Sequence, residues 1–248
     1  MEFREVLQKN LDKSTVALGS RQGGLLTLNI DNYPSIVITG ETGTGKSVLL
    51  DQILLQMINK YTSEDLRLVL IDTTGVELNY YKDTNYRLLT AMNDLDKSQE
   101  VLMKVIEEVD RRRELIDNSN VDNIDDYNLI YDHKIPRLVV AIDDNKSLLN
   151  VADVNKMIRR IITDIEDLNI FLIISTNDMN NKFFADKDNM LAKVLISFDT
   201  TSEEESATSA MPFSHDLLIG RFIIYKDGNY EEYHNFEFDD EIIKEVLN

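Results

Sequence analysis

The sequence contains no cysteine, no apolar stretch long enough to cross a membrane as a helix, and few basic residues for its number of acidic ones. Without cysteine, the chain can form neither disulfides nor a cysteine-based metal site. The residues after Met1 lack the apolar core of a signal peptide. We therefore expect a cytoplasmic protein, although a piece cut from a longer, membrane-anchored chain would look the same.

Basic residues are scarce: 26 Lys and Arg stand against 45 Asp and Glu, which gives a formal net charge of −19. Such a charge repels nucleic acid at long range unless the positive side chains gather on one surface. The simpler interpretation is a solvated acidic surface that keeps the protein soluble. The charge therefore argues against a DNA-binding role without excluding one.

The 248 residues can form one large domain with a sizeable core. Continuous apolar runs alternate with segments whose apolar residues recur every three or four positions, which predicts an α/β fold with a mostly parallel central β-sheet and helices on both faces. We take residues 1–24 as an N-terminal lead-in and 25–248 as the domain. Strands are predicted at 25–30, 36–38, 66–72, 138–144, 170–176, 194–198 and 222–225, helices at 48–60, 96–118, 154–168, from 202 and at 239–247, and a surface loop at 117–134.

The most informative stretch is a glycine-rich loop between an apolar strand and a helix. Gly40, Gly45, Lys46 and Ser47 complete the pattern G-x-x-x-x-G-K-[ST] of a phosphate-binding loop. Its glycines let successive N–H groups turn toward phosphate oxygens, and the positive end of the next helix adds to the attraction. A glycine-rich turn without a ligand is the alternative. The residues predicted to bind the nucleotide are Gly40, Glu41, Thr42, Gly43, Thr44, Gly45, Lys46, Ser47 and Val48.

Two adjacent acids, Asp143 and Asp144, end a later apolar strand. In P-loop enzymes a lysine such as Lys46 reaches the outer phosphates, and an acid after a buried strand helps a hydroxyl such as that of Ser47 to hold Mg²⁺. We therefore predict a metal site at Ser47 and Asp143. Asp144 is the candidate base that orients or deprotonates the attacking water. A pair of acids in an exposed turn is the alternative.

A second acidic motif decides between ATP and GTP. The sequence from Asp72 to Gly75 has the D-x-x-G form with which GTPases sense the γ-phosphate, but too few residues separate Lys46 from Asp72 for the switch segment and extra strand of a GTPase. The two sequences that begin at Asn145 and Asn181 lack the aspartate of a guanine-reading motif. We therefore expect ATP and Mg²⁺ as cofactors.

Further segments follow the phosphate loop in a characteristic order. Each of these segments resembles a sequence pattern that recurs in one protein family. Leu70–Leu78 resembles I-D-P-K-x-x-E-L, Glu108–Leu115 resembles E-M-E-R-R-Y-x-L, Asn123–Asn128 resembles N-I-x-G-Y-N, and Leu172–Asn177 resembles L-I-L-A-T-Q. Val139–Asp144 resembles the strand whose aspartate binds magnesium. Together they resemble the motor domain of the FtsK/SpoIIIE family of RecA-like DNA translocases, from about Val16 to Val246. The phosphate loop is the specific motif; the others count through their order and spacing.

The resemblance implies a RecA-like P-loop ATPase that forms a homo-oligomeric ring, commonly a hexamer, and translocates double-stranded DNA. It adds Asn177, at the place of the sensor glutamine, to the catalytic candidates Lys46, Asp143 and Asp144. Related motors of conjugation and type VII secretion move other cargo, so a hetero-assembly with related ATPases is the alternative. The arginines 111–113 are candidates for a finger that reaches a neighbouring subunit, or else complement the end of their own helix.

Several residues depart from the family pattern. Asp144 is one methylene shorter than the usual glutamate, Thr74 replaces a lysine, Asn177 and Asp178 replace a glutamine and an arginine, and residues 205–207 lack the arginine of a D-S-R segment. Each change weakens water positioning or charge stabilisation. We therefore expect nucleotide binding with slow or partner-dependent hydrolysis. The alternative function is a weakly hydrolytic module for assembly or substrate recruitment in a conjugation or type VII secretion machine.

Overall fold

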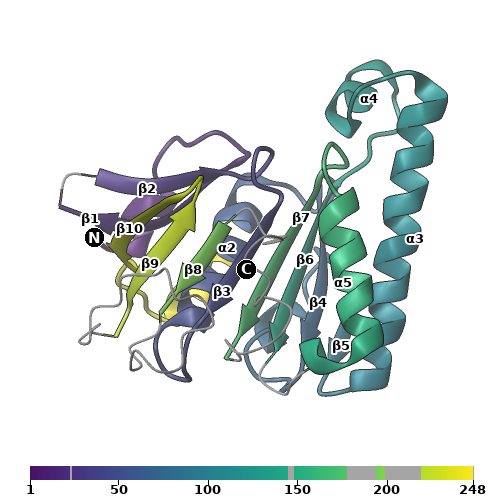
Figure 1. Cartoon of the computed structure of the whole chain (residues 1–248). Helices are drawn as coiled ribbons and strands as arrows, with labels where there is room; N and C mark the ends of the chain where they lie inside the picture. Colours follow the sequence, from purple (N-terminus) through teal and green to yellow (C-terminus); the bar gives the residue numbers. More distant parts are fainter. Residues whose placement is uncertain (23, 145–147, 178–193, 199–218, 248) are drawn as a thin grey trace.

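The computed structural model describes residues 1–22, 24–144, 148–177, 194–198 and 219–247, which form one ten-stranded sheet flanked by helices (Figure 1). The strands are β1 (Thr15–Arg21), β2 (Gly24–Asn29), β3 (Ser35–Thr39), β4 (Leu66–Asp72), β5 (Arg87–Met92), β6 (Arg137–Asp144), β7 (Ile170–Thr176), β8 (Val194–Ser197), β9 (Arg221–Lys226) and β10 (Asn229–His234). The helices are α1 (Phe3–Leu7), α2 (Lys46–Lys60), α3 (Leu95–Ser119), α4 (Ile124–Ile130), α5 (Ala152–Asp164) and α6 (Glu241–Leu247), with 3-10 turns η1 (Asn79–Tyr81) and η2 (Leu148–Asn150).

The sheet has a parallel part and an antiparallel extension, in the order β2-β1-β10-β9-β8-β3-β7-β6-β4-β5. The neighbours in β8-β3-β7-β6-β4-β5 pair in parallel. Beyond β8, the strands β9, β10, β1 and β2 continue the sheet by antiparallel pairing. Thr39, Thr176 and Asp144 are register partners across β3, β7 and β6. The carboxyl ends of the parallel strands therefore meet at one edge, which confirms the mostly parallel sheet.

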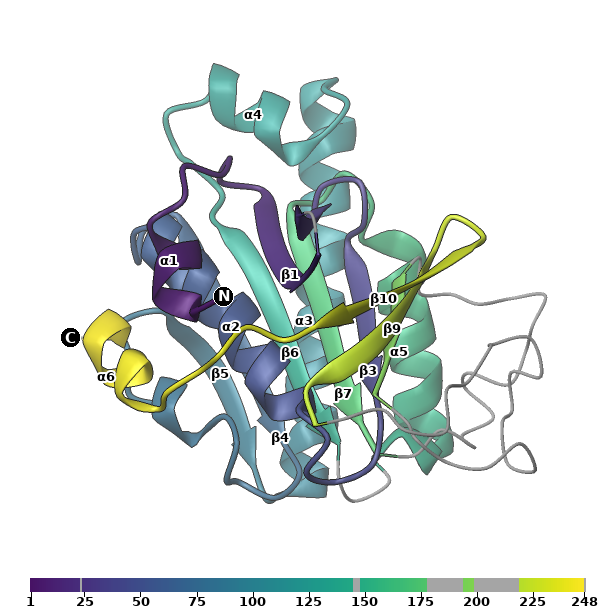
Figure 2. The same ribbon diagram turned by 90° about the vertical axis from the view of Figure 1, so that its left-hand side faces the viewer.

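Helices cover both faces of the parallel strands. Figures 1 and 2 show α3 and α5 on one face and α2 on the other, with α1 and α6 beside α2. Strand β3 is buried on both sides: Ile36 and Ile38 pack into the core under α2, and Val37 packs into the core under α3 and α5. This alternation follows from the two-residue period of a strand. No helix in the described ranges is long and apolar enough to cross a membrane.

Most long elements lie where the sequence predicts them. The segment 117–134, predicted as a surface loop, instead contains α4, so this prediction was wrong. The side chain of Asn123 accepts a hydrogen bond from the N–H of Asp126 at 2.8 Å and caps α4. The helix predicted up to residue 168 ends at Asp164, and Leu168 beyond it is nevertheless buried. The helix predicted from residue 202 lies outside the described residues.

Three short strands escaped the prediction: β1, β5 and β10. Strand β1 belongs to the segment expected as a lead-in, residues 1–24, which also contributes α1. The side chains of Phe3, Val6 and Val16 are buried in the core under α2. The N-terminal segment therefore packs on the same core as the residues that follow it.

The basic cluster at 111–113 anchors α3 at the amino-terminal edge of the sheet, opposite the phosphate loop. Arg112 is 2% exposed and donates to the carbonyls of Pro136, Leu168 and Asn169 at 2.8 to 3.1 Å, and to Glu108 at 2.7 Å. Arg112 therefore has a structural role, but its carbonyl acceptors precede β6 and β7 and do not belong to the end of its own helix, as the second interpretation expected.

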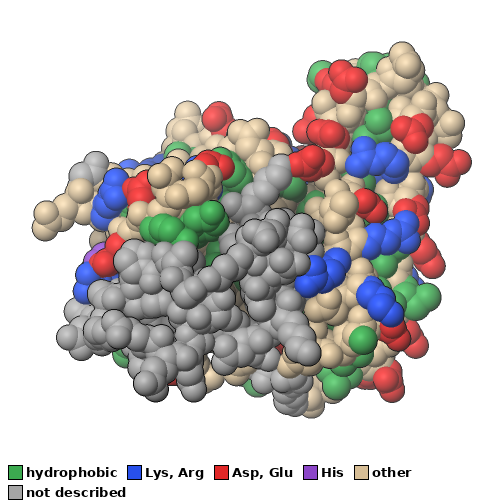
Figure 3. Space-filling model, in the orientation of Figure 1, with side chains coloured by type: hydrophobic (Ala, Val, Ile, Leu, Met, Phe, Trp, Pro, Cys, Tyr) green, Lys and Arg blue, Asp and Glu red, His purple; other side chains and the backbone are tan. Residues whose placement is uncertain are grey.

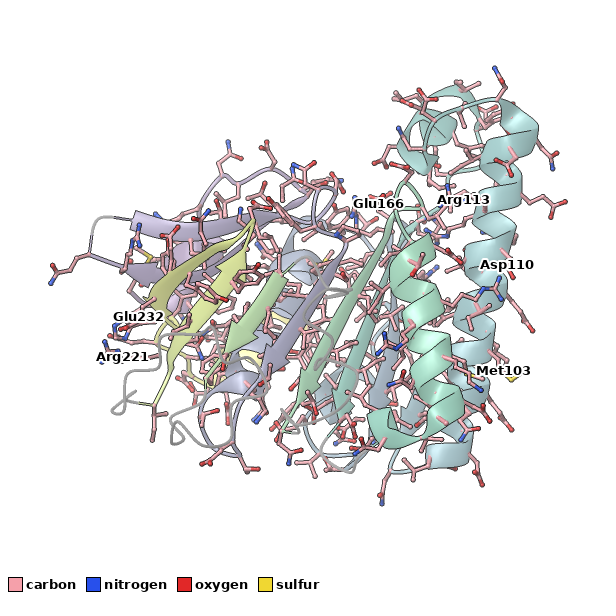
Figure 4. All side chains as sticks on the ribbon, viewed as in Figure 1. Met103, Asp110, Arg113, Glu166, Arg221 and Glu232 are labelled. Carbon is pink, nitrogen blue, oxygen red and sulfur yellow. The ribbon has the colours of Figure 1, made fainter. Side chains whose placement is uncertain are left out.

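Arg113 continues this anchor on the side of α5. Its guanidinium donates to the carbonyls of Asp164 and Glu166 at 2.8 and 3.1 Å. Figure 4 labels Arg113 on α3 and Glu166 beyond the end of α5. Arg111 differs from its two neighbours because it is half exposed and pairs with Glu108 alone among the described side chains. The end of α3 is therefore held by the guanidinium groups of Arg112 and Arg113.

Replacing Arg112 by alanine should lower the free energy of unfolding by about 3–5 kcal/mol, because it leaves three buried or partly buried carbonyls without their donor and removes the buried one of the two arginines that pair with Glu108. Arg111→Ala is the matched control: it removes a surface ion pair to the same Glu108 and should cost less than about 1 kcal/mol. Chemical denaturation of both variants measures the difference. Equal losses for the two variants would contradict the anchoring role of Arg112.

Candidate nucleotide-binding site

The loop between β3 and α2 has the backbone of a phosphate-binding loop. Gly40, Gly43 and Gly45 have positive φ angles of 146°, 84° and 117°, where other residues are strained. A Cβ atom on Gly40 would also lie 2.7 Å from Cβ of Phe198, and one on Gly45 would lie 2.9 Å from Nδ2 of Asn235. Backbone angle and space therefore both require glycine at position 40, while at position 45 the backbone angle favours glycine and an added Cβ would displace the Asn235 amide.

Hydrogen bonds from the C-terminal part of the chain hold the loop. The N–H of Gly220 donates to the carbonyl of Thr44 at 3.0 Å, and the side-chain amide of Asn235 donates to the carbonyl of Gly45 at 3.0 Å. Asn235 is itself fixed, because its N–H donates to Gly220 at 2.7 Å. Sequence reasoning missed Asn235: it follows β10 without a motif, and strand pairing alone brings it to the loop.

Lys46 is the first residue of α2 and is folded back over the loop. Its Nζ atom donates to the carbonyl of Glu41 at 2.8 Å, and the residue is only 5% exposed. The hydroxyl of Thr44 donates to the same carbonyl at 2.8 Å. The lysine thus lies at the positive end of a 15-residue helix, beside the main-chain amides that the sequence predicts to face phosphate.

A cavity of about 630 Å³ opens next to this loop. This is a usual size for a small-molecule site. It is lined by Thr42, Gly43, Gly45, Lys46, Ser47, Val48, Thr74, Val76, Glu77, Asn177 and Ile219. The structure thus brings Asn177 together with most of the predicted loop residues. Gly40, Glu41, Thr44, Asp143 and Asp144 do not line it. Cavities of about 330 and 490 Å³ border Arg137 at the opposite edge of the sheet.

Asp143 lies at the carboxyl end of β6, in register with Asp72 of β4 and Ser175 of β7. Burial raises its pKa to about 7; the neighbouring Ser175 lowers this pKa, Asp72 and Glu77 raise it further, and Lys46 lowers it. Asp143 lies at the same carboxyl edge of the sheet as the end of β3, from which the loop leads to Lys46. A buried carboxylate among other acids is a suitable position for a cation, which would offset the repulsion.

The residues present fit Mg²⁺ bound together with phosphates. Ser47 offers a hydroxyl at the cavity wall, and Asp143 offers a buried carboxylate at the same edge. Across the described part of the chain, no three His, Cys, Asp or Glu side chains could hold a metal ion by themselves. Mg²⁺ suits such a site because it usually takes one or two protein ligands and completes its shell with phosphate oxygens and water.

Asp144 points its carboxylate at the chain that follows β6. Its Oδ1 atom accepts a hydrogen bond from the N–H of Leu148 at 2.8 Å, and its Oδ2 atom accepts one from the N–H of Leu149 at 2.9 Å. The residue is 1% exposed. Asp144 therefore organises the turn η2 in this structure.

The D-x-x-G segment is a self-contained turn. Oδ1 of Asp72 accepts hydrogen bonds from the N–H and the hydroxyl of Thr74 at 2.9 Å and from the N–H of Gly75 at 2.8 Å. Oδ2 accepts a fourth from the N–H of Leu78 at 3.0 Å. With its carboxylate bound to its own loop, Asp72 has a structural role.

Asp51 and Tyr81 form a polar contact that the sequence did not reveal. Asp51 lies one helical turn after Ser47 on α2, and its Oδ1 atom accepts a hydrogen bond from the Tyr81 hydroxyl at 2.6 Å. Burial raises the pKa of Asp51 to about 7; the Tyr81 hydrogen bond lowers it, and the charges of Glu77, Asp240 and Asp143 raise it. The pair connects the phosphate-loop helix to the turn η1.

Known proteins share the sequence family and the fold of this chain. The order of the strands and the glycine-rich loop are those of the RecA-like P-loop ATPase fold. The FtsK/SpoIIIE family model matches residues 4–211, and the chain belongs to this family. Over 241 residues it is 28% identical to the DNA translocase FtsK of Clostridium tetani, covering 91% of this chain and 32% of the relative. It is 27% identical to the DNA translocase SpoIIIE of Bacillus subtilis over 239 residues, covering 89% and 30%.

Solved structures share the fold at low sequence identity. EssC (ATPases 2 and 3) from Geobacillus thermodenitrificans matches with a TM-score of 0.78 and 21% identity, covering 94% of this chain and 46% of that one. The conjugation coupling protein TcpA in a monomer form with ATPgS matches with a TM-score of 0.75 and 22% identity, covering 95% and 70%. The chain spans about a third of the length of the FtsK and SpoIIIE relatives.

The raised pKa of Asp51 makes stability depend on pH. Between pH 3.8, the ordinary pKa of an aspartate, and about pH 7, the folded state holds a proton that the unfolded state has released. Stability therefore falls as pH rises through this window. Asp51→Asn keeps an acceptor for Tyr81 and removes the charge, so it should stabilise the protein more at pH 8 than at pH 5, by about 2 kcal/mol.

Urea denaturation at the two pH values measures this difference. The exposed Glu64→Gln is the control, and it should change stability by less than about 0.5 kcal/mol at either pH. An Asp51→Asn effect that is the same at pH 5 and pH 8 would show that the carboxylate is not held protonated in the folded state.

Proposed function

We propose that this chain binds ATP with Mg²⁺ in the cavity beside residues 40–48. We further propose that it acts as the motor domain of a cytoplasmic ring, a hexamer of like subunits, which couples ATP hydrolysis to the movement of double-stranded DNA. One observation carries the proposal. A loop with three glycines at positive φ precedes α2, and its Lys46 and Ser47 lie at the same edge of the sheet as the buried Asp143.

The loop residues supply the binding of the triphosphate. Main-chain N–H groups of the loop and of the first turn of α2 face the phosphates, and Lys46 exchanges the carbonyl of Glu41 for the outer phosphate oxygens. Ser47 and Asp143 hold Mg²⁺, which supplies positive charge between those oxygens when it is bound. Asn177 in the cavity wall offers an amide near the same place.

The family and two of its members support the choice of cargo. The relatives in Clostridium tetani and Bacillus subtilis are DNA translocases, and each shares about 90% of this chain's length. Support for the nucleotide comes from the fold shared with TcpA, which was solved with ATPgS. Because the relatives are about three times longer, the ring and its cargo remain part of the proposal.

A second function is favoured by two observations: a weakly hydrolytic module for assembly or substrate recruitment in a conjugation or type VII secretion machine. The candidate base Asp144 is hydrogen-bonded to main-chain amides. The formal charge of −19 also opposes DNA binding. On the face drawn in Figure 3, Lys and Arg side chains over α3 and α5 alternate with Asp and Glu side chains.

ATP turnover with and without duplex DNA, measured together with the mass of the assembly in the presence of nucleotide, tests the proposal. We expect slow turnover alone, a several-fold increase with DNA, and a ring-sized mass with ATP. Lys46→Ala should lower turnover by at least ~10²-fold, because it removes a charge that stabilises the transition state.

The outcomes separate the two functions. Nucleotide binding with no response to DNA would favour the recruitment module over the motor. A wild-type protein that binds no nucleotide at all would contradict both. Brisk turnover by the isolated chain would contradict the expected slow hydrolysis.

A further inference from the structure

The proposed ATPase needs a carboxylate that can accept a proton from water, and Asp144 is poorly placed for this role. Both of its carboxylate oxygens accept main-chain hydrogen bonds from η2. A base must instead have an oxygen within hydrogen-bond reach of the attacking water. Among the described residues that line the cavity beside Lys46, one side chain carries a carboxylate: Glu77.

Glu77 stands on a loop that is fixed on both sides. Before it, Asp72 binds the N–H groups of Thr74 and Gly75, at 2.9 and 2.8 Å. After it, Asp72 binds the N–H of Leu78 at 3.0 Å, and the Leu78 side chain is completely buried. Glu77 therefore has a rigid backbone and a half-buried side chain, as preorganised catalysis requires.

The other end of the loop is tied to the phosphate-loop helix. Tyr81 in η1 is completely buried and donates its hydroxyl to Asp51, which lies one turn beyond Ser47 on α2. The loop that carries Glu77 and the helix that carries Lys46 and Ser47 are thus joined by a direct hydrogen bond. Their relative positions are set before any nucleotide binds.

Glu77 lines the same cavity as Lys46 and Ser47. Within the described residues, no hydrogen bond or ion pair engages the Glu77 carboxylate, in contrast to Asp72 and Asp144. An acid facing the place of a triphosphate weakens ground-state binding by repulsion. Its presence there is explained if it acts on the reacting water.

We propose that Glu77 is the general base of ATP hydrolysis in this chain, while Asp144 positions the η2 turn. The water oxygen forms a bond to the γ-phosphorus as the bond from that phosphorus to the oxygen of the β-phosphate breaks. The water proton passes to the Glu77 carboxylate and then to solvent, and ADP and inorganic phosphate leave. This inference rests on the proposed ATPase function and assigns its base.

The test compares Glu77→Gln with Asp144→Asn in the full chain. Binding of a fluorescent ATP analogue with Mg²⁺ gives Kd, and single-turnover hydrolysis of γ-labelled ATP with protein in excess gives the chemical rate, with duplex DNA present. For Glu77→Gln we expect Kd to stay equal or become up to about threefold tighter, because a repulsive charge is removed, and the rate to fall about 10²–10⁴-fold. Asp144→Asn should lower the thermal midpoint and reduce the rate of the folded protein less than Glu77→Gln.

Four results would contradict the assignment of Glu77 as the base or the proposed function itself. A Glu77→Gln rate within about threefold of the parent, or a larger loss for Asp144→Asn with its thermal midpoint unchanged, would overturn the assignment. A parent that binds ATP without any single-turnover hydrolysis would also overturn it, because no base would be at work. A parent that binds no ATP would instead refute the proposed function, and this result is visible in the binding measurement alone.

Discussion

The hydrogen bonds that hold the carbonyls of Thr44 and Gly45 are the constraint on which the site depends. A phosphate-binding loop functions when its N–H groups face the ligand, and this requires its carbonyls to be bound elsewhere. Here the N–H of Gly220 donates to the carbonyl of Thr44, and the side-chain amide of Asn235 donates to the carbonyl of Gly45. Gly220 directly precedes β9 and Asn235 directly follows β10, so the antiparallel extension of the sheet supports the candidate nucleotide site.

The carboxyl edge of the parallel strands concentrates acids whose roles differ by their hydrogen bonds. The carboxylate oxygens of Asp72 and Asp144 accept hydrogen bonds from main-chain amides and stabilise the turns after β4 and β6. Asp143 is buried and its pKa is raised, which suits the metal ligand that we propose. Glu77 faces the cavity from a fixed loop. Carboxylates at this edge thus shape two turns, and we propose that two others bind the metal and act as the base.

The sequence predicted what local pattern determines. The buried strands β4 and β6, the helix α2 and the glycine positions of the loop follow from apolar runs and from one specific motif. It could not predict α4, because Asn and Asp in that segment resemble a loop unless the capping pair of Asn123 and Asp126 is noticed. Asn235 and the Asp51–Tyr81 contact were missed because residues distant in sequence make them. The direction of the Asp144 carboxylate depends on η2, which carries no motif.

We propose that a triphosphate lies against the amides of residues 41–47, with Mg²⁺ bound by Ser47 and Asp143. A crystal or cryo-EM structure of the chain with Mg²⁺ and a non-hydrolysable ATP analogue would test this placement. We expect phosphates within the loop, Lys46 released from the carbonyl of Glu41 and turned to the outer phosphate, and the metal in contact with the Ser47 hydroxyl. Phosphates bound away from this loop, or a metal remote from both Ser47 and Asp143, would contradict it.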